Sequence, residues 1–304
     1  MSLSHSSVTA KLTAATLLVA RHDPRLSALV DAPTESVIAS CLRRQGPHFR
    51  ALVALRHSRA ACALALWVQR RDSPGFCVHY AARKRCMFGL ARAAIEDGFR
   101  QVVLLGAGFD MASHALAQIA GLTIIEVDHP ATQRDKLRGM NGAAPLPPNV
   151  TFRAADFERD SLAQALSTCP GFDAASDTLY VAEGLLMYLT PGAVDRLFEQ
   201  MRMPTVSAGR PRVRCILSTV SPDAGGRLCL HSQGRLARAI QLVLRERFIW
   251  GPKPEAIEPY LRFRGWTIGA HLRFADFLRA GAPKELRARA PRDTGESVVV
   301  AEAV

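Results

Sequence analysis

The sequence has no apolar run long enough to cross a membrane. Its longest apolar stretches, residues 14–20 and 60–68, fall well short of the roughly 18 residues that a spanning helix needs. The N-terminus also lacks the charged segment and long apolar core that a secretory signal would show. The sequence therefore predicts no membrane partner and no export, and we expect a cytoplasmic protein.

Paired cysteines and metal-ligand motifs are missing as well. The 7 cysteines are scattered without a C-x-x-C pair, and the 9 histidines include no H-E-x-x-H motif. This pattern excludes a disulfide framework and a zinc site of known spacing. We expect free thiols and no structural metal.

Acidic residues are scarce between positions 201 and 292. This segment carries 18 basic and 6 acidic residues, an excess of 12 that accounts for the whole net charge of +12. Such a segment can attract nucleic acid, a lipid surface or an anionic substrate. However, aromatic residues make up only 7% of the chain, and the arginines are spread over many elements, which disfavours the base-stacking surface of a nucleic-acid binder. A solvated basic surface is the simplest interpretation.

The most informative stretch is 101–110, QVVLLGAGFD. Its short apolar run, half of it β-branched, is typical of a strand buried on both faces of a parallel sheet. Gly106, Ala107 and Gly108 follow directly, and a helical pattern covers 111–119. A strand, a glycine turn and a helix in this order let a ligand approach the main chain closely.

A second buried strand pattern, TIIEVDHP at 123–130, ends in Glu126 and Asp128. An acid at the tip of the second strand is placed to accept both ribose hydroxyls of a bound nucleoside. Met111 occupies the place of the third glycine that pyrophosphate-binding folds carry. The pattern therefore favours a nucleoside without pyrophosphate, such as S-adenosylmethionine. A structural turn with a solvated acid is the alternative.

Five motifs in the same order resemble the leucine carboxyl methyltransferase family. They are RKR at 83–85, GFRQVVLLGAGFD at 98–110, EVDHPATQRDK at 126–136, DF at 156–157 and TLYVAEGLLMYL at 178–189. The chain is most similar to bacterial O-methyltransferases of the tetracenomycin carboxyl methyltransferase type. The resemblance is strongest over about 79–200.

The resemblance implies an S-adenosylmethionine site. Arg83 matches the arginine that binds the cofactor's carboxylate, with Arg85 as the alternative. Asp156 matches the residue that accepts from the adenine amine, with Phe157 covering the ring; Asp156 could instead cap a helix at 161–166. Glu183 matches a glutamate near the cofactor's methionine part, and a buried Glu183 would need a cationic partner.

The elements predict an α/β fold of the class I methyltransferase type, with a Rossmann-like, seven-stranded, mostly parallel sheet. We expect strands at 101–105, 122–127, 149–154, 177–182, 212–220, 266–272 and 297–301, with the final hairpin inserted antiparallel. Helices are expected at 8–21, 34–44, 49–70 and 78–97. We interpret the chain as a single domain, with a helical cap at 1–97, a core at 98–304 and an insertion around 221–250.

Together these features predict an O-methyltransferase acting on a carboxylate or hydroxyl of a small-molecule or peptide acceptor. A carboxylate is ionised at neutral pH and needs no general base, whereas a hydroxyl does. His79, His129 and His231 are the candidate bases, each more simply structural. A nicotinamide-dependent oxidoreductase and a non-catalytic binding protein on the same sheet are the alternative functions. No catalytic residue and no oligomeric state can be assigned.

Overall fold

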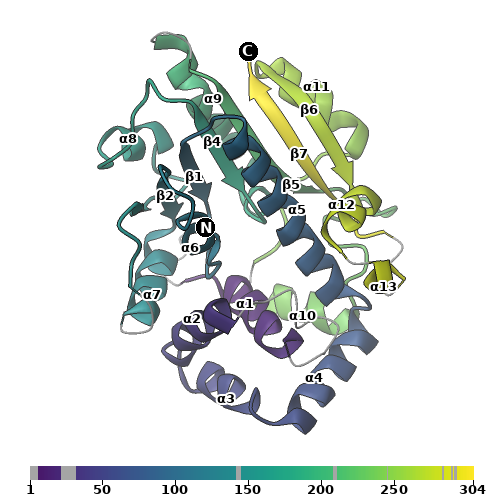
Figure 1. The fold of residues 1–304 in the computed structure, drawn as a ribbon. Coiled ribbons are helices and arrows are strands. Elements are labelled where there is room, and N and C mark those ends of the chain that lie inside the picture. The colour runs from purple at the N-terminus through teal and green to yellow at the C-terminus, as the bar shows by residue number, and fades with distance from the viewer. Residues whose placement is uncertain are drawn as a thin grey trace.

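The computed structural model describes residues 6–21, 32–141, 145–207, 211–244, 246–282, 284–288, 290 and 293–304. Within these ranges the chain forms a seven-stranded sheet in the order β3-β2-β1-β4-β5-β7-β6 (Figure 1). The strands are β1 (Gln101–Leu105), β2 (Thr123–Asp128), β3 (Val150–Ala154), β4 (Thr178–Ala182), β5 (Val213–Val220), β6 (Trp266–Arg273) and β7 (Glu296–Ala303). The seven predicted strands are confirmed, with ends that differ by no more than two residues.

Strand direction also follows the prediction. The pairs β1·β2, β1·β4, β2·β3 and β4·β5 are parallel. Strand β7 lies between β5 and β6 and is antiparallel to both. The predicted fold class, a Rossmann-like and mostly parallel sheet, is confirmed.

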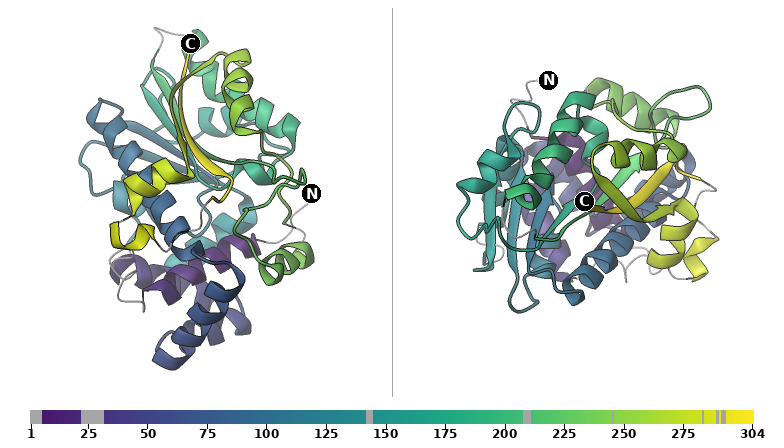
Figure 2. Two further views of the ribbon diagram at one scale, coloured as in Figure 1. Left: turned by 90° about the vertical axis from the view of Figure 1, so that its right-hand side faces the viewer. Right: turned by 90° about the horizontal axis from the view of Figure 1, so that it is seen from above.

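Helices lie on both faces of this sheet and beyond its carboxyl edge. They are α1 (Val8–Ala20), α2 (Ala32–Arg43), α3 (Pro47–Leu55), α4 (Arg59–Asp72), α5 (Phe76–Glu96), α6 (Ala112–Leu116), α7 (Pro130–Met140), α8 (Leu162–Ser167), α9 (Pro191–Ser207), α10 (Arg235–Leu244), α11 (Ile257–Phe263), α12 (Phe274–Gly281) and α13 (Lys284–Arg287). Figure 2 shows the sheet between these layers, with α5 and α12 on one side and α9 and α11 on the other.

Alternate residues of the central strands enter different cores, which explains their continuous apolar runs. Val103 and Leu105 of β1 pack in the cluster formed with α8, α9 and α11. Val102 and Leu104 pack in the cluster formed with α5, α6 and α12. Every residue of β1 is buried, so the strand has no solvent-facing side on which polar residues would alternate.

The helices α1–α4 gather beyond the carboxyl ends of the strands (Figure 1). A third core, which includes Leu18, Ile38 and Val53, joins α1, α2 and α3 to each other and to the glycine turn after β1. Helix α5 packs on the sheet through the second core, so it covers the sheet although it was predicted within the cap. The division into cap and core stays a prediction.

The predicted single helix at 49–70 is wrong, because the chain forms α3 and α4 with a break between them. Ser58 is the reason, since its hydroxyl accepts from the backbone N–H of Ala61 and starts a new helix there. The helix expected at 111–119 is shorter and covers only α6. Among the described residues no single helix is long and apolar enough to span a membrane; α3 and α4 meet that test only as a pair bent by 108°.

Candidate functional site

The glycine turn after β1 forms the floor of a pocket at the carboxyl edge of the sheet. Gly106 and Gly108 have φ values of +65° and +56°, which favour glycine. A Cβ on Gly106 would lie 2.7 Å from a methyl carbon of Leu185. The turn therefore needs glycine both for its backbone conformation and for the space above it.

All eight residues predicted to bind the cofactor line this pocket, which has a cavity volume of about 420 Å³. They are Arg83, Gly106, Ala107, Gly108, Asp128, Asp156, Phe157 and Glu183. They come from α5, from the last residue of β2 and from the segments that follow β1, β3 and β4. The structure thus brings the predicted residues together, while the role of each one stays a prediction.

Asp128, the last residue of β2, ties the strand to the glycine turn. Its Oδ2 accepts from the backbone N–H of Gly108 at 2.6 Å, and its Oδ1 accepts from the N–H of His129 at 2.6 Å. Burial raises the pKa of Asp128 to about 6, although both hydrogen bonds work in the opposite direction. Each carboxylate oxygen keeps a further lone pair for a ligand hydroxyl.

Glu126, two residues earlier in β2, lies in the protein interior. Its side chain is fully buried, and its Oε1 lies 2.6 Å from the Nζ of Lys136. Burial of this pair removes Glu126 as a ligand for a nucleoside. The ribose hypothesis therefore depends on Asp128.

Arg83 lies in a buried ion network. Its Nε donates to Oε1 of Glu183 at 3.0 Å, and its Nη1 donates to Oε1 of Glu296, on β7, at 2.8 Å. The Nε2 of His79 lies 2.5 Å from the second oxygen of Glu296 and must carry the proton, because a carboxylate only accepts. The cationic partner predicted for Glu183 is therefore present. Arg85 is exposed and does not line the pocket, so the structure favours Arg83 over this alternative.

Lys84 and Asp110 also line the pocket and were missed as site residues. The Nζ of Lys84 lies 2.6 Å from Oδ2 of Asp110 and 3.3 Å from Oε1 of Glu183. Both residues stand inside motifs that the sequence analysis quoted, directly next to predicted ligands. That adjacency was the available signal, because Lys84 follows Arg83 and Asp110 ends the glycine turn.

Asp156 follows β3 and does not cap the next helix. Ser161 caps α8, since its hydroxyl accepts from the N–H of Gln164 at 3.2 Å. Asp156 instead accepts from the N–H of Glu158 within its own turn. The helix-capping alternative for Asp156 is wrong, and its carboxylate lies in the pocket wall beside Phe157.

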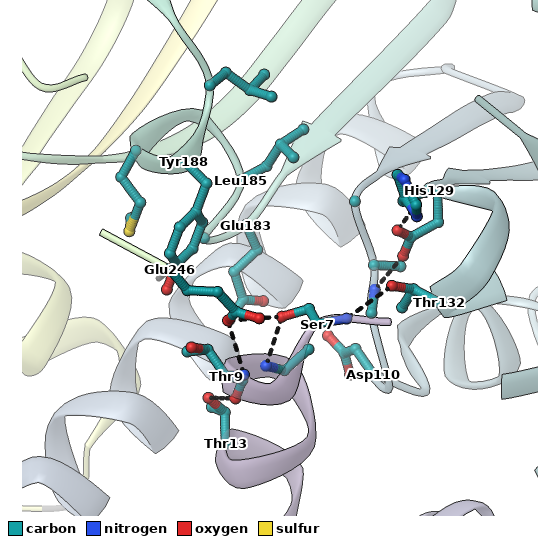
Figure 3. Close-up of a pocket in the computed structure, with 18 of the residues that line it drawn as sticks. Ser7, Thr9, Thr13, Asp110, His129, Thr132, Glu183, Leu185, Tyr188 and Glu246 are labelled. Atoms are coloured by element: carbon teal, nitrogen blue, oxygen red, sulfur yellow. Dashed lines mark hydrogen bonds between the residues drawn. The ribbon is translucent and has the colours of Figure 1, made fainter. Parts of the chain in front are cut away.

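The other half of the pocket is apolar and aromatic. Its lining includes Leu17, Phe76, Tyr80, Met187, Tyr188, Leu230 and Phe248. Glu246 closes this side against the start of α1, where it accepts from the backbone N–H groups of Val8 and Thr9 at 2.8 Å and from the hydroxyl of Ser7 at 3.1 Å (Figure 3). A carboxylate suits this place, because a helix N-terminus carries unsatisfied N–H donors and partial positive charge.

Of the candidate bases, only His129 lines the pocket. Its Nδ1 accepts from the N–H of Ala131 and caps α7. His79 is buried against Glu296, and His231 contacts Asp293; neither is among the described lining residues.

Comparison with known proteins places the chain in a family. The sequence model of the leucine carboxyl methyltransferase family matches residues 18–202. A protein of Mycobacterium sp. (strain KMS), named as a candidate S-adenosyl-L-methionine-dependent methyltransferase, is 31% identical over 194 residues. That match covers 62% of this chain and 63% of the relative, so the chain spans less than two thirds of the relative's length.

A longer match extends over most of both chains. A protein of Mycolicibacterium smegmatis with the same description is 30% identical over 284 residues, which cover 90% of this chain and 86% of that protein. The crystal structure of a candidate methyltransferase from Thermobifida fusca YX has 19% sequence identity, a TM-score of 0.58, and covers 80% of this chain and 88% of its own. At that identity the structural match supports the fold alone. With the family match across more than half of its length, the chain belongs to the leucine carboxyl methyltransferase family.

Proposed function

We propose that this protein is an S-adenosylmethionine-dependent O-methyltransferase that acts on a carboxylate of a small-molecule or peptide acceptor. Family membership and the names of its relatives support the methyltransferase activity. The observation that carries the choice of a carboxylate is the lack of a suitable base among the described residues of the pocket.

The residues of the pocket fit S-adenosylmethionine by their chemistry. Asp128 offers carboxylate lone pairs to ribose hydroxyls, and Phe157 offers an apolar surface to the adenine ring. Arg83 uses three N–H groups on Glu183 and Glu296, which leaves two of its five donors for the cofactor's carboxylate. The glycine turn has no side chains at Gly106 and Gly108, so its backbone is accessible to a ligand. When bound, the cofactor supplies an electrophilic methyl group on a sulfonium.

Five of the polar groups that line the pocket do not suit proton abstraction at neutral pH. Burial raises the pKa of Tyr80 to about 12 and raises the pKa of Tyr188 further. Asp110 and Glu183 are held by Lys84, and Glu246 is held by α1. His129 also lines the pocket, but its Nδ1 accepts from the N–H of Ala131, so a neutral ring carries its proton on Nε2 and has no nitrogen left to take another. With Asp128 assigned to the ribose, a hydroxyl acceptor would meet no free base among these groups, whereas a carboxylate acceptor needs none.

The protein's contribution to methyl transfer is then orientation and exclusion of water. Tyr188 and Phe248 pack edge to face with ring centroids 5.2 Å apart and line the apolar half of the pocket. Glu246 holds α1 beside them. An acceptor placed there by its apolar part would present an ionised oxygen toward the glycine turn.

The test is the chemistry of the methylated product. The protein is incubated with methyl-labelled S-adenosylmethionine and a panel of aromatic and aliphatic monocarboxylic acids, with phenols and alcohols of matched size in parallel. A carboxylate product is a methyl ester that releases labelled methanol in mild alkali, whereas an ether is stable. Labelled methanol from the acids alone supports the proposal, and alkali-stable product from the hydroxyl compounds alone contradicts it.

Cofactor binding is measured separately, by titration calorimetry with S-adenosylhomocysteine and with NADH. We expect binding of S-adenosylhomocysteine, weakened about tenfold or more (about 1.4 kcal/mol) by Asp128→Asn. Binding of NADH alone would favour the oxidoreductase alternative. Binding of neither by folded protein would favour a non-catalytic binding protein.

A further inference from the structure

Helices α4 and α10 expose several large apolar side chains. On α4, Leu64 is 61% exposed, Trp67 59% and Val68 39%. On α10, Leu236 is 52% exposed and Val243 81%. The two helices contact each other, and Figure 1 shows them at the end of the molecule beyond the carboxyl edge of the sheet.

Helix α10 carries a stripe of apolar residues on its exposed side. Leu236, Ile240 and Val243 fall at spacings of four and three residues and so form one stripe along the helix, and all three are exposed. No residue of α10 is buried. The side that faces the protein includes Gln241, which lines the pocket. The helix therefore turns its apolar stripe to the outside, which costs free energy unless a partner covers it.

The charges on and beside these stripes are mostly positive. Residues 36–71 include 7 arginines and no acidic residue, and residues 224–244 include 3 arginines and no acidic residue. Asp72, the last residue of α4, is occupied within the protein, because its carboxylate accepts from the backbone N–H groups of Leu236 and Ala237 and thereby caps α10. An anionic partner would complement this surface.

We propose that the outer surface of α4 and α10 docks on an anionic lipid surface. An amphipathic helix with arginines beside its apolar stripe is suited to the boundary between headgroups and acyl chains, and tryptophan is enriched at that depth. A second copy of the chain docked through the same surface would bring its arginines close to those of the first. Nucleic acid would leave the apolar stripes uncovered. The sequence predicted no membrane partner from the lack of a spanning helix, and surface docking requires none.

The fluorescence of Trp67 can report on this contact. Trp67 is 59% exposed, whereas Trp250 and Trp266 are 7% and 1% exposed, and the chain has only 3 tryptophans. Entry of Trp67 into a lipid surface would shift its fluorescence emission to shorter wavelength. The full chain is titrated with vesicles of phosphatidylcholine alone and of phosphatidylcholine with 30% phosphatidylglycerol, and binding is quantified by sedimentation.

We expect a blue shift and sedimentation with the anionic vesicles only, and weaker binding at higher salt. The double variant Leu236→Gln, Ile240→Gln should bind at least tenfold more weakly. Arg59→Gln and Arg235→Gln should each weaken binding about fivefold. Phe263→Gln is the matched control, because Phe263 is 88% exposed on α11, away from α4 and α10, and should change nothing.

The proposal is overturned if the anionic vesicles produce neither a shift nor sedimentation. It is equally overturned if the Leu236→Gln, Ile240→Gln variant binds like the parent, or if Phe263→Gln abolishes binding as strongly. Light scattering after size exclusion tests the competing occupant. A dimer that this double variant dissociates would assign the surface to a second copy of the chain.

Discussion

Replacing Glu296 with glutamine would measure how much the buried ion network beneath the pocket contributes to stability. Glu296 is 1% exposed, and its two oxygens bind Arg83 and His79. Glutamine keeps the shape of the side chain and removes the charge. The variant therefore tests the electrostatic contribution with little change in packing.

The size of the effect follows from the pKa. Burial alone would raise the pKa of Glu296, but the charge of Arg83 and the hydrogen bond from His79 lower it from 4.5 to about 2. A difference of that size corresponds to about 3 kcal/mol in favour of the folded state at pH 7. Because the folded pKa is the lower one, this contribution is complete above about pH 5 and is lost as the pH falls from 4.5 through 2.

The assay is urea unfolding of Glu296→Gln and the parent protein at pH 7 and at pH 3. We expect the variant to be about 3 kcal/mol less stable at pH 7 and only about 1.4 kcal/mol less stable at pH 3. Glu302→Gln is the matched control, since Glu302 lies on the same strand and pairs with Arg214 while its side chain is 51% exposed; an exposed pair contributes about 1 kcal/mol or less.

A Glu296→Gln variant within about 0.5 kcal/mol of the parent at pH 7 would refute the reasoning. It would mean that the cost of burying the charges cancels their attraction, as happens in some buried ion pairs. An equal loss in Glu302→Gln would refute it differently, because burial would then make no difference.

Two further predictions concern Asp128 in the pocket and the contact between α2 and α7. Burial raises the pKa of Asp128 to about 6, and the ionised form offers more acceptors, so the affinity for S-adenosylhomocysteine should fall severalfold from pH 7.5 to 5. Calorimetry should show no such fall in Asp128→Asn. The same pH dependence in the variant and the parent would contradict the role of Asp128. Gly139→Ala should destabilise the protein by about 1–3 kcal/mol in urea unfolding, because the new Cβ would lie 2.3 Å from Cα of Cys41. The control Gly89→Ala, whose Cβ would have nothing within 4 Å, should stabilise it by up to about 1 kcal/mol. Equal effects of the two substitutions would refute the packing argument.

The sheet could be predicted because local sequence determines its elements strongly. The central strands are short apolar runs bounded by polar or glycine residues, and burial on both faces keeps such runs free of polar alternation. The break between α3 and α4 was not predicted, because the apolar spacing continues across it and only the cap at Ser58 marks it. A capping hydroxyl is a weak signal inside a long periodic segment.

The grouping of pocket residues at the carboxyl edge of the sheet could be predicted for a topological reason. In a parallel sheet the segments after successive strands emerge at one edge, so residues 106–108, Asp128, Asp156 and Glu183 meet without any knowledge of the loops. Lys84 was missed because nothing in a single sequence says that its side chain turns into the pocket while that of Arg85 turns out.

The partners that hold the site in place could not be predicted, because they come from distant parts of the chain. Glu296 lies 213 residues after Arg83, and Glu246 lies 238 residues after Val8. Each supplies a carboxylate to an element that carries pocket residues, α5 in one case and α1 in the other. The family resemblance is strongest over 79–200, yet Arg83 and the first helix depend on residues beyond it. Arg83→Ala would therefore leave Glu296 buried beside His79 alone, and a loss of ligand binding in that variant would combine a missing ligand with a weakened fold. Among the described residues Asp128 accepts from backbone N–H groups and forms no ion pair, so it is the cleaner residue with which to test the site.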